Sequence, residues 1–288
     1  MNVNAKYKDS VFSFLFSDPD LLRELYCALK GVDLPPDVPV VINTLENVLF
    51  MELINDISFV IGGKLVVLIE HQSTVNPNMA LRLLLYIARV YENMASDKSL
   101  YSTRPLSIPR PEFFVLYNGK APYPDEQKLK LSDLFEKTEM LGLPEQAAFA
   151  LELEVRVLNI NEGRNSAIAQ RCRKLAEYSA FIAKVREFEK ELDNKGEAMK
   201  AAIGYCREHD ILKEFLEKHS SEVFNMLLTE WKTEDAIKVW YEEGREEGRT
   251  SEREEIAKQA LAKGLPSEMI HEITGLDLDA IKDIQARF

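Results

Sequence analysis

The sequence is poor in the residues that build several common kinds of site. It has three cysteines in 288 residues, Cys27, Cys172 and Cys206, and their spacing fits neither a disulfide framework nor a CxxC zinc site. Its four histidines show no metal-ligand spacing. A P-loop, a GxGxxG motif and a Ser-His-Asp order are also missing. These absences exclude a disulfide-rich secreted domain, a zinc finger and the common nucleotide-binding motifs.

Long apolar runs are missing as well. No apolar stretch approaches the roughly 18 residues that a membrane-spanning helix needs, and the polar first residues predict no secretory signal peptide. The composition, 46% hydrophobic, is sufficient for the core of one or two domains. We therefore expect a cytoplasmic, soluble protein that does not bind membranes.

Positive charge is in deficit, because the formal net charge is −12 at pH 7. This balance argues against a nucleic-acid partner, since Lys and Arg supply the affinity for phosphate backbones. The charge is uneven, however: residues 164–186 hold six basic residues and one acid, whereas residues 242–255 hold seven Glu and three Arg. The basic segment, with Arg171, Arg173 and Lys174, is either a phosphate-binding surface or a solvated helix face.

A β-hairpin is the clearest local pattern. Residues 55–61 are rich in β-forming side chains, Gly62 and Gly63 supply a tight turn, and residues 64–69 form a nearly continuous apolar strand. The near absence of polar residues in the second strand predicts that it is buried on both faces.

Polar residues stand at the ends of these two strands. Asp56 stands at the head of the first strand, and Glu70 and Gln72 end the second. Side chains two apart on a strand share a face, so Glu70 and Gln72 point the same way and His71 points the other way as a packing residue. Two carboxylates and an amide, joined by a strand carbonyl, make a ready site for a hard divalent cation, Mg²⁺ or Mn²⁺.

The remaining elements predict an α/β core that ends near residue 160. A helix is expected from Leu21 to about Leu29, and a crossover helix from about Pro77 to Met94. Residues 151–158 alternate apolar and charged side chains, which is typical of an edge strand. Beyond residue 161 the chain is predicted to be helical, and the glycines of 244–248 are expected to end or weaken a helix.

The pattern around the hairpin resembles a known family. Asp-(x)n-Glu-x-Gln on adjacent strands resembles the PD-(D/E)XK nuclease core, with Gln72 in the place of the usual lysine. The wider pattern is similar to the YhgA-like or Rpn family, known as recombination-promoting nucleases or putative transposases. The likeness covers most of the chain, in residues 8–12, 55–59, 68–74, 76–79, 82, 86, 178–179, 181–182 and 244–249.

The resemblance implies a fold class and a domain division. It implies an α/β protein with a PD-(D/E)XK restriction-endonuclease-like core and a mixed sheet, followed by an all-helical C-terminal half. Residues 1–160 would form the nuclease-like core, 161–243 a helical domain, and 244–288 a linker and a small helix-turn-helix-like tail. The acidic tail offers a poor surface for a DNA groove, so a dimerisation or interaction module is the favoured role.

The resemblance also implies a metal-dependent DNA endonuclease that hydrolyses phosphodiester bonds and is associated with recombination and mobile elements. Asp56 and Glu70 would hold Mg²⁺ or Mn²⁺, and Gln72 would position the attacking water. Asp9 is the candidate for a further catalytic acid from the first helix, although a plain helix cap would look the same in sequence. Glu24 on the following helix is the alternative acid.

DNA and a second copy of the chain are the expected partners. Arg82, Arg171, Arg173 and Lys174 are the candidate DNA contacts, and Arg82 is equally suited to support Glu70. A homodimer is expected because the helical half has more apolar stripe than one small domain needs. The alternative function is a non-catalytic interaction protein of the same fold, whose metal binding is weakened by Gln72.

Overall fold

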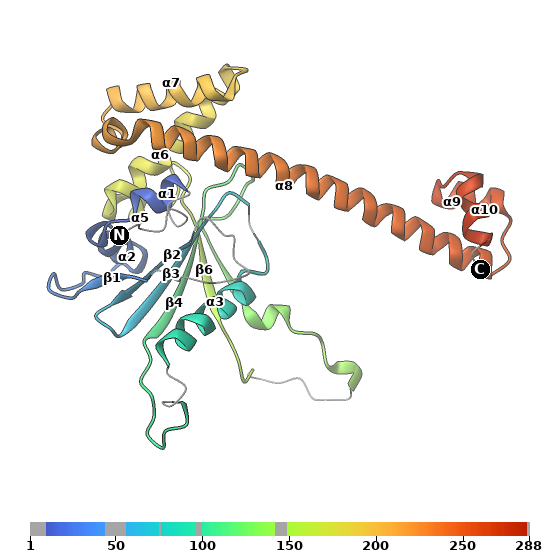
Figure 1. Ribbon diagram of the computed structural model, residues 1–288, viewed down its shortest axis with the longest axis horizontal. Helices are drawn as coiled ribbons and strands as arrows, with labels where there is room; N and C mark the ends of the chain where they lie inside the picture. The colour runs from blue at the N-terminus through green and yellow to red at the C-terminus, as the bar shows by residue number, and fades with distance from the viewer. Residues whose placement is uncertain (1–9, 44–55, 75, 96–99, 142–148, 287–288) are drawn as a thin grey trace. The chain divides into compact units, whose positions relative to one another are not determined.

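The protein divides into two compact units, Met1–Leu227 and Leu228–Phe288, shown with their elements in Figure 1. The computed structural model describes residues 10–43, 56–74, 76–95, 100–141 and 149–286. The sequence-based division placed boundaries after residues 160 and 243, whereas the structure groups the helices up to Leu227 with the sheet.

The first unit is built on one mixed sheet. Its strands in the described residues are β1 (Val40–Ile42), β2 (Asp56–Ile61), β3 (Leu65–Gln72), β4 (Arg110–Tyr117), β5 (Glu126–Lys130) and β6 (Glu154–Asn159). They lie in the order β1-β2-β3-β4-β6-β5, with β3, β4 and β6 parallel and the other neighbouring pairs antiparallel. This α/β architecture with a mixed sheet and a helical part confirms the predicted fold class.

The β2–β3 hairpin forms as the sequence predicts. Gly62 and Gly63 have φ angles of 57° and 65°, and the N–H of Lys64 donates to the carbonyl of Ile61 at 3.0 Å to close the turn. Glycine adopts such left-handed φ angles at little cost because it has no Cβ. β3 then pairs with β2 on one side and with β4 on the other, which explains its apolar composition.

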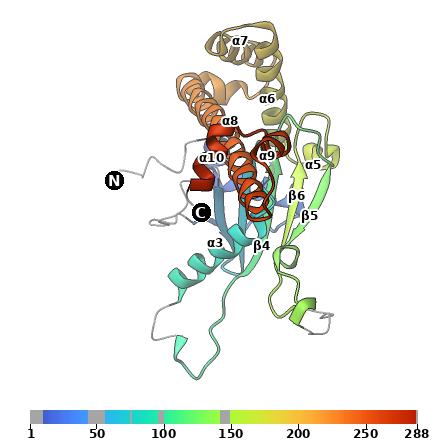
Figure 2. The ribbon, with the colours of Figure 1, turned by 90° about the vertical axis from the view of Figure 1, so that its right-hand side faces the viewer.

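The position of β6 differs from the sequence-based expectation. The alternation over residues 151–158 predicted an edge strand, but β6 lies between β4 and β5, and Figure 2 shows β5 outside it. The edge is taken instead by β5, a polar segment that is exposed at four of its five positions. The alternation of apolar and charged residues in β6 does not reflect exposure to solvent. Its Arg156 forms an ion pair with Glu126 on the neighbouring strand β5, at 2.8 Å.

One face of the sheet is covered by α3 (Met79–Met94). Met79, Leu83, Tyr86 and Val90 of this helix are buried, and they pack on the strands in a single apolar cluster. The strand residues of this cluster include Val66, Leu68, Phe113, Val115, Tyr117, Val155 and Val157. The predicted crossover helix is confirmed, with its start at Met79.

The opposite face is contacted by α1 (Val11–Leu15), α2 (Pro19–Lys30) and α6 (Arg173–Glu191), through Phe12, Tyr26 and Tyr178. α2 begins where the Asp18 side chain accepts the N–H of Asp20 at 2.8 Å, and it ends at Gly31 with a φ of 68°. Aspartate favours the start of a helix and glycine its end, and the predicted helix from Leu21 to about Leu29 is confirmed.

The remaining helices of the described chain follow the sheet in sequence. The first unit also contains the short 3₁₀ turns η2 (Leu131–Leu134) and η3 (Glu139–Leu141), α5 (Ser166–Arg171), α7 (Lys195–Glu208) and the first turns of α8 (Lys213–Ala262). α8 continues as helix through residues 244–248, so of the two alternatives, an ended helix or a weakened one, the structure excludes the first. Each glycine costs a helix only about 1 kcal/mol.

The second unit is helical. It consists of the rest of α8, α9 (Ser267–Thr274) and α10 (Leu278–Ala286). Ala257, Ile270, Ile281 and Ile284 form its buried core. No helix in the described part of the chain combines the length and the apolar character needed to span a bilayer.

Candidate functional site

The hairpin brings the two predicted metal ligands to one register position. Asp56 pairs with Glu70 across the antiparallel ladder, and directly opposed positions of such a ladder belong to the same face of the sheet. The side chain of Asp56 and the whole of Asp9 lie outside the part of the chain that the structure describes. The backbone therefore agrees with the expected placement of Asp56, while the catalytic roles of both acids remain predictions.

Glu70 is a buried carboxylate with a cationic partner. Its side chain is 5% exposed, and its Oε1 lies 3.0 Å from Nη2 of Arg82, near the start of α3. Removing a carboxylate from water is unfavourable by several kcal/mol unless a counter-charge is near. Of the two roles considered for Arg82, the structure assigns the support of Glu70. A phosphate contact by Arg82 stays a prediction.

Gln72 is fixed between β3 and α3. Its Nε2 donates to Oε1 of Glu70 and to Sδ of Met79, the latter at 2.9 Å. Gln72 is 9% exposed, and its Oε1 has no hydrogen-bond partner among the described residues. The sequence pattern did not indicate the contact with Met79, because a methionine at a helix start is usually a packing residue.

These oxygen atoms fit a hard divalent cation. Mg²⁺ and Mn²⁺ prefer oxygen ligands from carboxylates, amides and water. Glu70 offers a carboxylate, and the Oε1 atom of Gln72 is a buried oxygen without a partner. Among the side chains described, no three of His, Cys, Asp or Glu gather around one point. A cation site at this position would therefore need Asp56 as its second carboxylate.

His71 lies on the other face, as strand alternation predicts. Its ring stacks on Phe12 at 4.9 Å between centroids, and its Nε2 is hydrogen bonded to the hydroxyl of Tyr178 at 3.2 Å. Burial, and to a lesser degree the charge of Arg186, lowers the pKa of His71 to about 3. His71 is therefore a neutral packing residue at neutral pH, and it does not face Glu70.

The polar cluster at the carboxyl ends of β3 and β4 fixes the chain immediately beyond Gln72. Arg186 donates to Oδ1 of Asn161 at 2.8 Å and to the carbonyl of Asn118. A Cβ atom on Gly119 would lie 2.0 Å from the carbonyl oxygen of Ser73, so only glycine fits this approach. The loops after the two strands are thereby held against each other.

Glu24, the alternative acid, is engaged elsewhere. Its Oε1 accepts the N–H of Arg173 at 3.0 Å, at the first residue of α6. α2 lies on the His71 face of the sheet, because its Tyr26 donates a hydrogen bond to Glu112. Glu112 points to that face because the next residue on β4, Phe113, packs in the α3 cluster on the other face. The structure therefore does not bring Glu24 to Glu70.

The basic residues proposed as DNA contacts are paired with acids. Arg171 pairs with Asp33, and Arg173 and Lys174 both pair with Glu177, at 2.6 and 2.9 Å. Asp33 comes from a distant part of the sequence, which the local charge count could not include. Exposed ion pairs contribute about 0–1 kcal/mol, so a phosphate could replace Asp33, whereas the Glu177 side chain is only 12% exposed. The DNA-contact role of these residues is untested.

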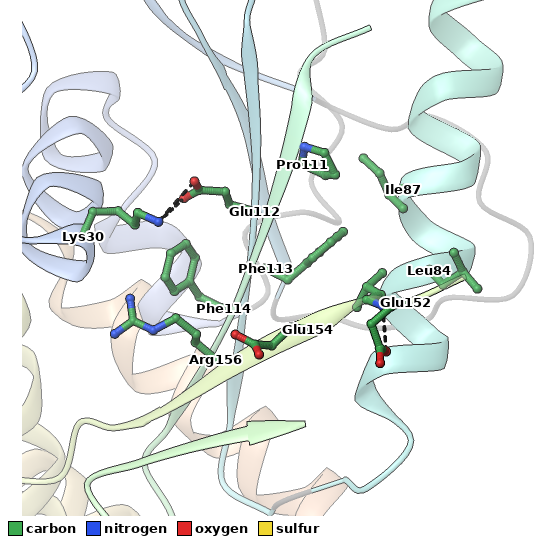
Figure 3. Close-up of a pocket in the computed structure, with 11 residues that line it drawn as sticks. Lys30, Leu84, Ile87, Pro111, Glu112, Phe113, Phe114, Glu152, Glu154 and Arg156 are labelled. Carbon is green, nitrogen blue, oxygen red and sulfur yellow. Dashed lines mark hydrogen bonds and ion pairs between the residues drawn. The ribbon is translucent and has the colours of Figure 1, made fainter. Parts of the chain in front are cut away.

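An open hollow of about 420 Å³ lies at the start of β4 (Figure 3). Leu84 of α3 and Phe113 line it on one side of the strand, and Lys30 meets Glu112 at 3.2 Å on the other. None of the predicted site residues lines this hollow. The ladder pairs Glu112 with Val67, three residues before Glu70, so the hollow is separate from the candidate site.

A family model described as "Putative transposase, YhgA-like" matches residues 51–200, just over half of the chain. The match spans Asp56, Glu70, Gln72 and all four candidate DNA-contact residues. No curated protein and no solved structure matches the chain.

Proposed function

The chain belongs to the YhgA-like putative transposase family, and from this membership we propose that it is a divalent-metal-dependent DNA endonuclease. The observation that carries the proposal is the buried Glu70 carboxylate, which stands opposite Asp56 in the hairpin register and beside the Gln72 amide. A charged side chain in a core strand is unfavourable unless it is paired or coordinates a metal ion. Buried ionisable groups of this kind are common at active sites.

Asp56 and Glu70 are the residues proposed to hold Mg²⁺ or Mn²⁺. When bound, such an ion supplies positive charge for the phosphodiester oxygens and makes a water molecule more acidic. Arg82 holds the Glu70 carboxylate at 3.0 Å, so this ligand is oriented before any ion arrives. A side chain that is already oriented loses less conformational entropy when it binds an ion.

Gln72 is proposed to orient the attacking water. Its Nε2 is fixed by Glu70 and Met79, which leaves Oε1 as the buried acceptor for a water proton. An amide oxygen can hold a water for in-line attack, but it adds no positive charge to the transition state. Compared with a lysine at this position, Gln72 makes the chemistry depend more on the ion.

DNA is the proposed substrate, and a homodimer is the proposed assembly. A dimer would present two single-ion sites, one to each strand of a duplex, which is the simplest route to a double-strand break. Arg173, with its side chain 80% exposed, is the most accessible of the candidate backbone contacts. Its replacement should weaken binding to every DNA sequence alike.

Nicking of supercoiled plasmid in the presence of Mg²⁺ or Mn²⁺ tests the proposal. We expect nicking by the wild type and its loss in Asp56→Ala and Glu70→Gln. Glu112→Gln is the matched control, because Glu112 lies in the same sheet, is 12% exposed at its side chain and pairs with Lys30 instead of Arg82. Nicking that persists in both acid variants would show that these residues are not the site.

One observation favours a second candidate, a non-catalytic interaction protein of the same fold. Arg82 already neutralises Glu70, and Gln72 replaces the lysine of the PD-(D/E)XK pattern. In this case the purified protein would bind neither Mg²⁺ nor Mn²⁺, and Glu70→Gln would leave its partner binding unchanged.

A further inference from the structure

Ser58 is a buried serine whose hydroxyl is left without a partner. It lies on β2, is 3% exposed, and its Oγ makes no hydrogen bond within the described part of the chain. A buried polar group without a partner destabilises a protein by about 1–3 kcal/mol. Alanine or valine at this position would avoid that cost, so the hydroxyl calls for an explanation.

The register places Ser58 beside the candidate site. Ser58 is two residues from Asp56 and pairs with Leu68, which is two residues from Glu70. Positions two apart on a strand share a face, so Ser58 and Glu70 are diagonal neighbours on the same face. Gln72, on the other side of Glu70 along β3, carries the second unpartnered oxygen of this face.

Two buried oxygens without partners therefore flank one buried carboxylate. An apolar neighbour satisfies neither of them, whereas a hard cation takes neutral oxygens together with carboxylates. A serine or threonine hydroxyl is an established kind of Mg²⁺ ligand in phosphate-transferring sites. With Gln72 Oε1 assigned to the water, the hydroxyl of Ser58 is left for the ion itself.

We propose that the Ser58 hydroxyl is a ligand of the divalent cation that Glu70 binds. The inference rests on the proposed function, because it needs an ion at Glu70. It extends that function by adding a neutral oxygen from β2 to the two carboxylates of the ligand set, on the same face of the hairpin.

Cation binding to the full-length protein, measured without DNA, tests this inference. Free Mn²⁺ can be followed by its electron paramagnetic resonance signal, and Cd²⁺ by calorimetry. We expect Ser58→Ala to weaken Mn²⁺ binding at least tenfold. Ser58→Cys should shift preference toward Cd²⁺ by at least tenfold relative to Mn²⁺, because a thiolate is a soft ligand.

Two controls separate a ligand from a structural residue. Ser58→Thr and Ser58→Val add a similar volume, so a difference in Mn²⁺ affinity between them reports the hydroxyl even where Ser58→Ala folds poorly. Ser179→Cys is the control for the thiol, because Ser179 is also buried but already donates to the Leu175 carbonyl at 2.9 Å.

The outcomes distinguish this inference from the proposed function. Equal Mn²⁺ affinity in the threonine and valine variants, with no Cd²⁺ preference in Ser58→Cys, would overturn the role of Ser58. If Glu70→Gln still lost Mn²⁺ binding in that case, the proposed nuclease function would remain supported. A wild type that binds no Mn²⁺ would overturn both.

Discussion

The guanidinium of Arg82 meets the carboxylate of Glu70 at 3.0 Å, and this ion pair joins the start of α3 to the end of β3. The two side chains are 21% and 5% exposed, so the pair is screened from water. It has two consequences: it compensates a buried charge in the absence of an ion, and it orients the carboxylate toward the face that carries Gln72 and Ser58.

Arg82→Ala should destabilise the protein by roughly 3 kcal/mol, because it leaves Glu70 buried without its counter-charge. Arg82→Lys should lose less, since it keeps the charge but not the planar guanidinium. Urea unfolding measures both. Mg²⁺ should raise the unfolding midpoint of Arg82→Ala more than that of the wild type, because the ion replaces the lost charge.

The control for this prediction is Arg89→Ala. Arg89 lies on the same helix and pairs with Glu92, but both side chains are more than half exposed, so its loss should change stability by less than about 1 kcal/mol. Equal effects of Arg82→Ala and Arg89→Ala would contradict a buried, compensating role for Arg82.

Gln72→Leu should lower the single-turnover rate of plasmid nicking at least roughly tenfold, because it removes the amide that orients water while preserving much of the volume. DNA affinity, measured by fluorescence anisotropy, should be unchanged. Gln72→Lys should keep activity, since an ammonium at this position supplies positive charge. Met79→Leu, which removes only the sulfur acceptor, should show a smaller loss than Gln72→Leu. A Gln72→Leu variant with the wild-type rate would remove Gln72 from the mechanism.

The three thiols should react at different rates in the native protein. Cys27 is partly exposed, whereas Cys172 and Cys206 are buried, and burial raises their pKa values to about 12 and about 11. A disulfide reagent near pH 8 should label Cys27 quickly and the other two only as the protein unfolds. Cys27→Ser should abolish the fast phase, and fast labelling of three thiols would contradict the packing of α6 and α7.

The same two thiols predict a loss of stability at high pH. In the unfolded chain a thiol ionises near pH 9, whereas in the folded protein Cys172 stays protonated up to about pH 12. The unfolded state therefore loses its proton first, and the free energy of unfolding should fall as the pH rises from about 9 toward 12. Urea unfolding across this range should show a flatter profile for Cys172→Ala than for the wild type.

Self-association through the second unit is a further expected outcome. Met269 and Ile273 on α9 are 48% and 59% exposed, an apolar surface that a partner copy would cover. Met269→Glu with Ile273→Glu should convert a dimer to a monomer in light scattering without loss of helix content. Glu272→Gln, a change of an exposed residue on the same helix, is the control. A wild type that is monomeric at micromolar concentration would contradict the dimer.

Local patterns in the sequence determined the hairpin and the two faces of β3. Gly62 and Gly63 fix the turn because only glycine adopts successive left-handed conformations at little cost, and the period of two along a strand then separates Glu70 and Gln72 from His71. The caps of α2 and the apolar spacing of α3 are local in the same sense, so these elements were also predictable.

The partners of the site residues were decided only by the tertiary structure. Arg82 and Met79 meet Glu70 and Gln72 because α3 packs against β3, and no local pattern encodes which side chains then touch. The interior position of β6 and the pairing of Arg171 with Asp33 depend on segments far away in the sequence. Propensity and periodicity act over a few residues, whereas charge pairing and burial are set by the neighbours that folding brings together.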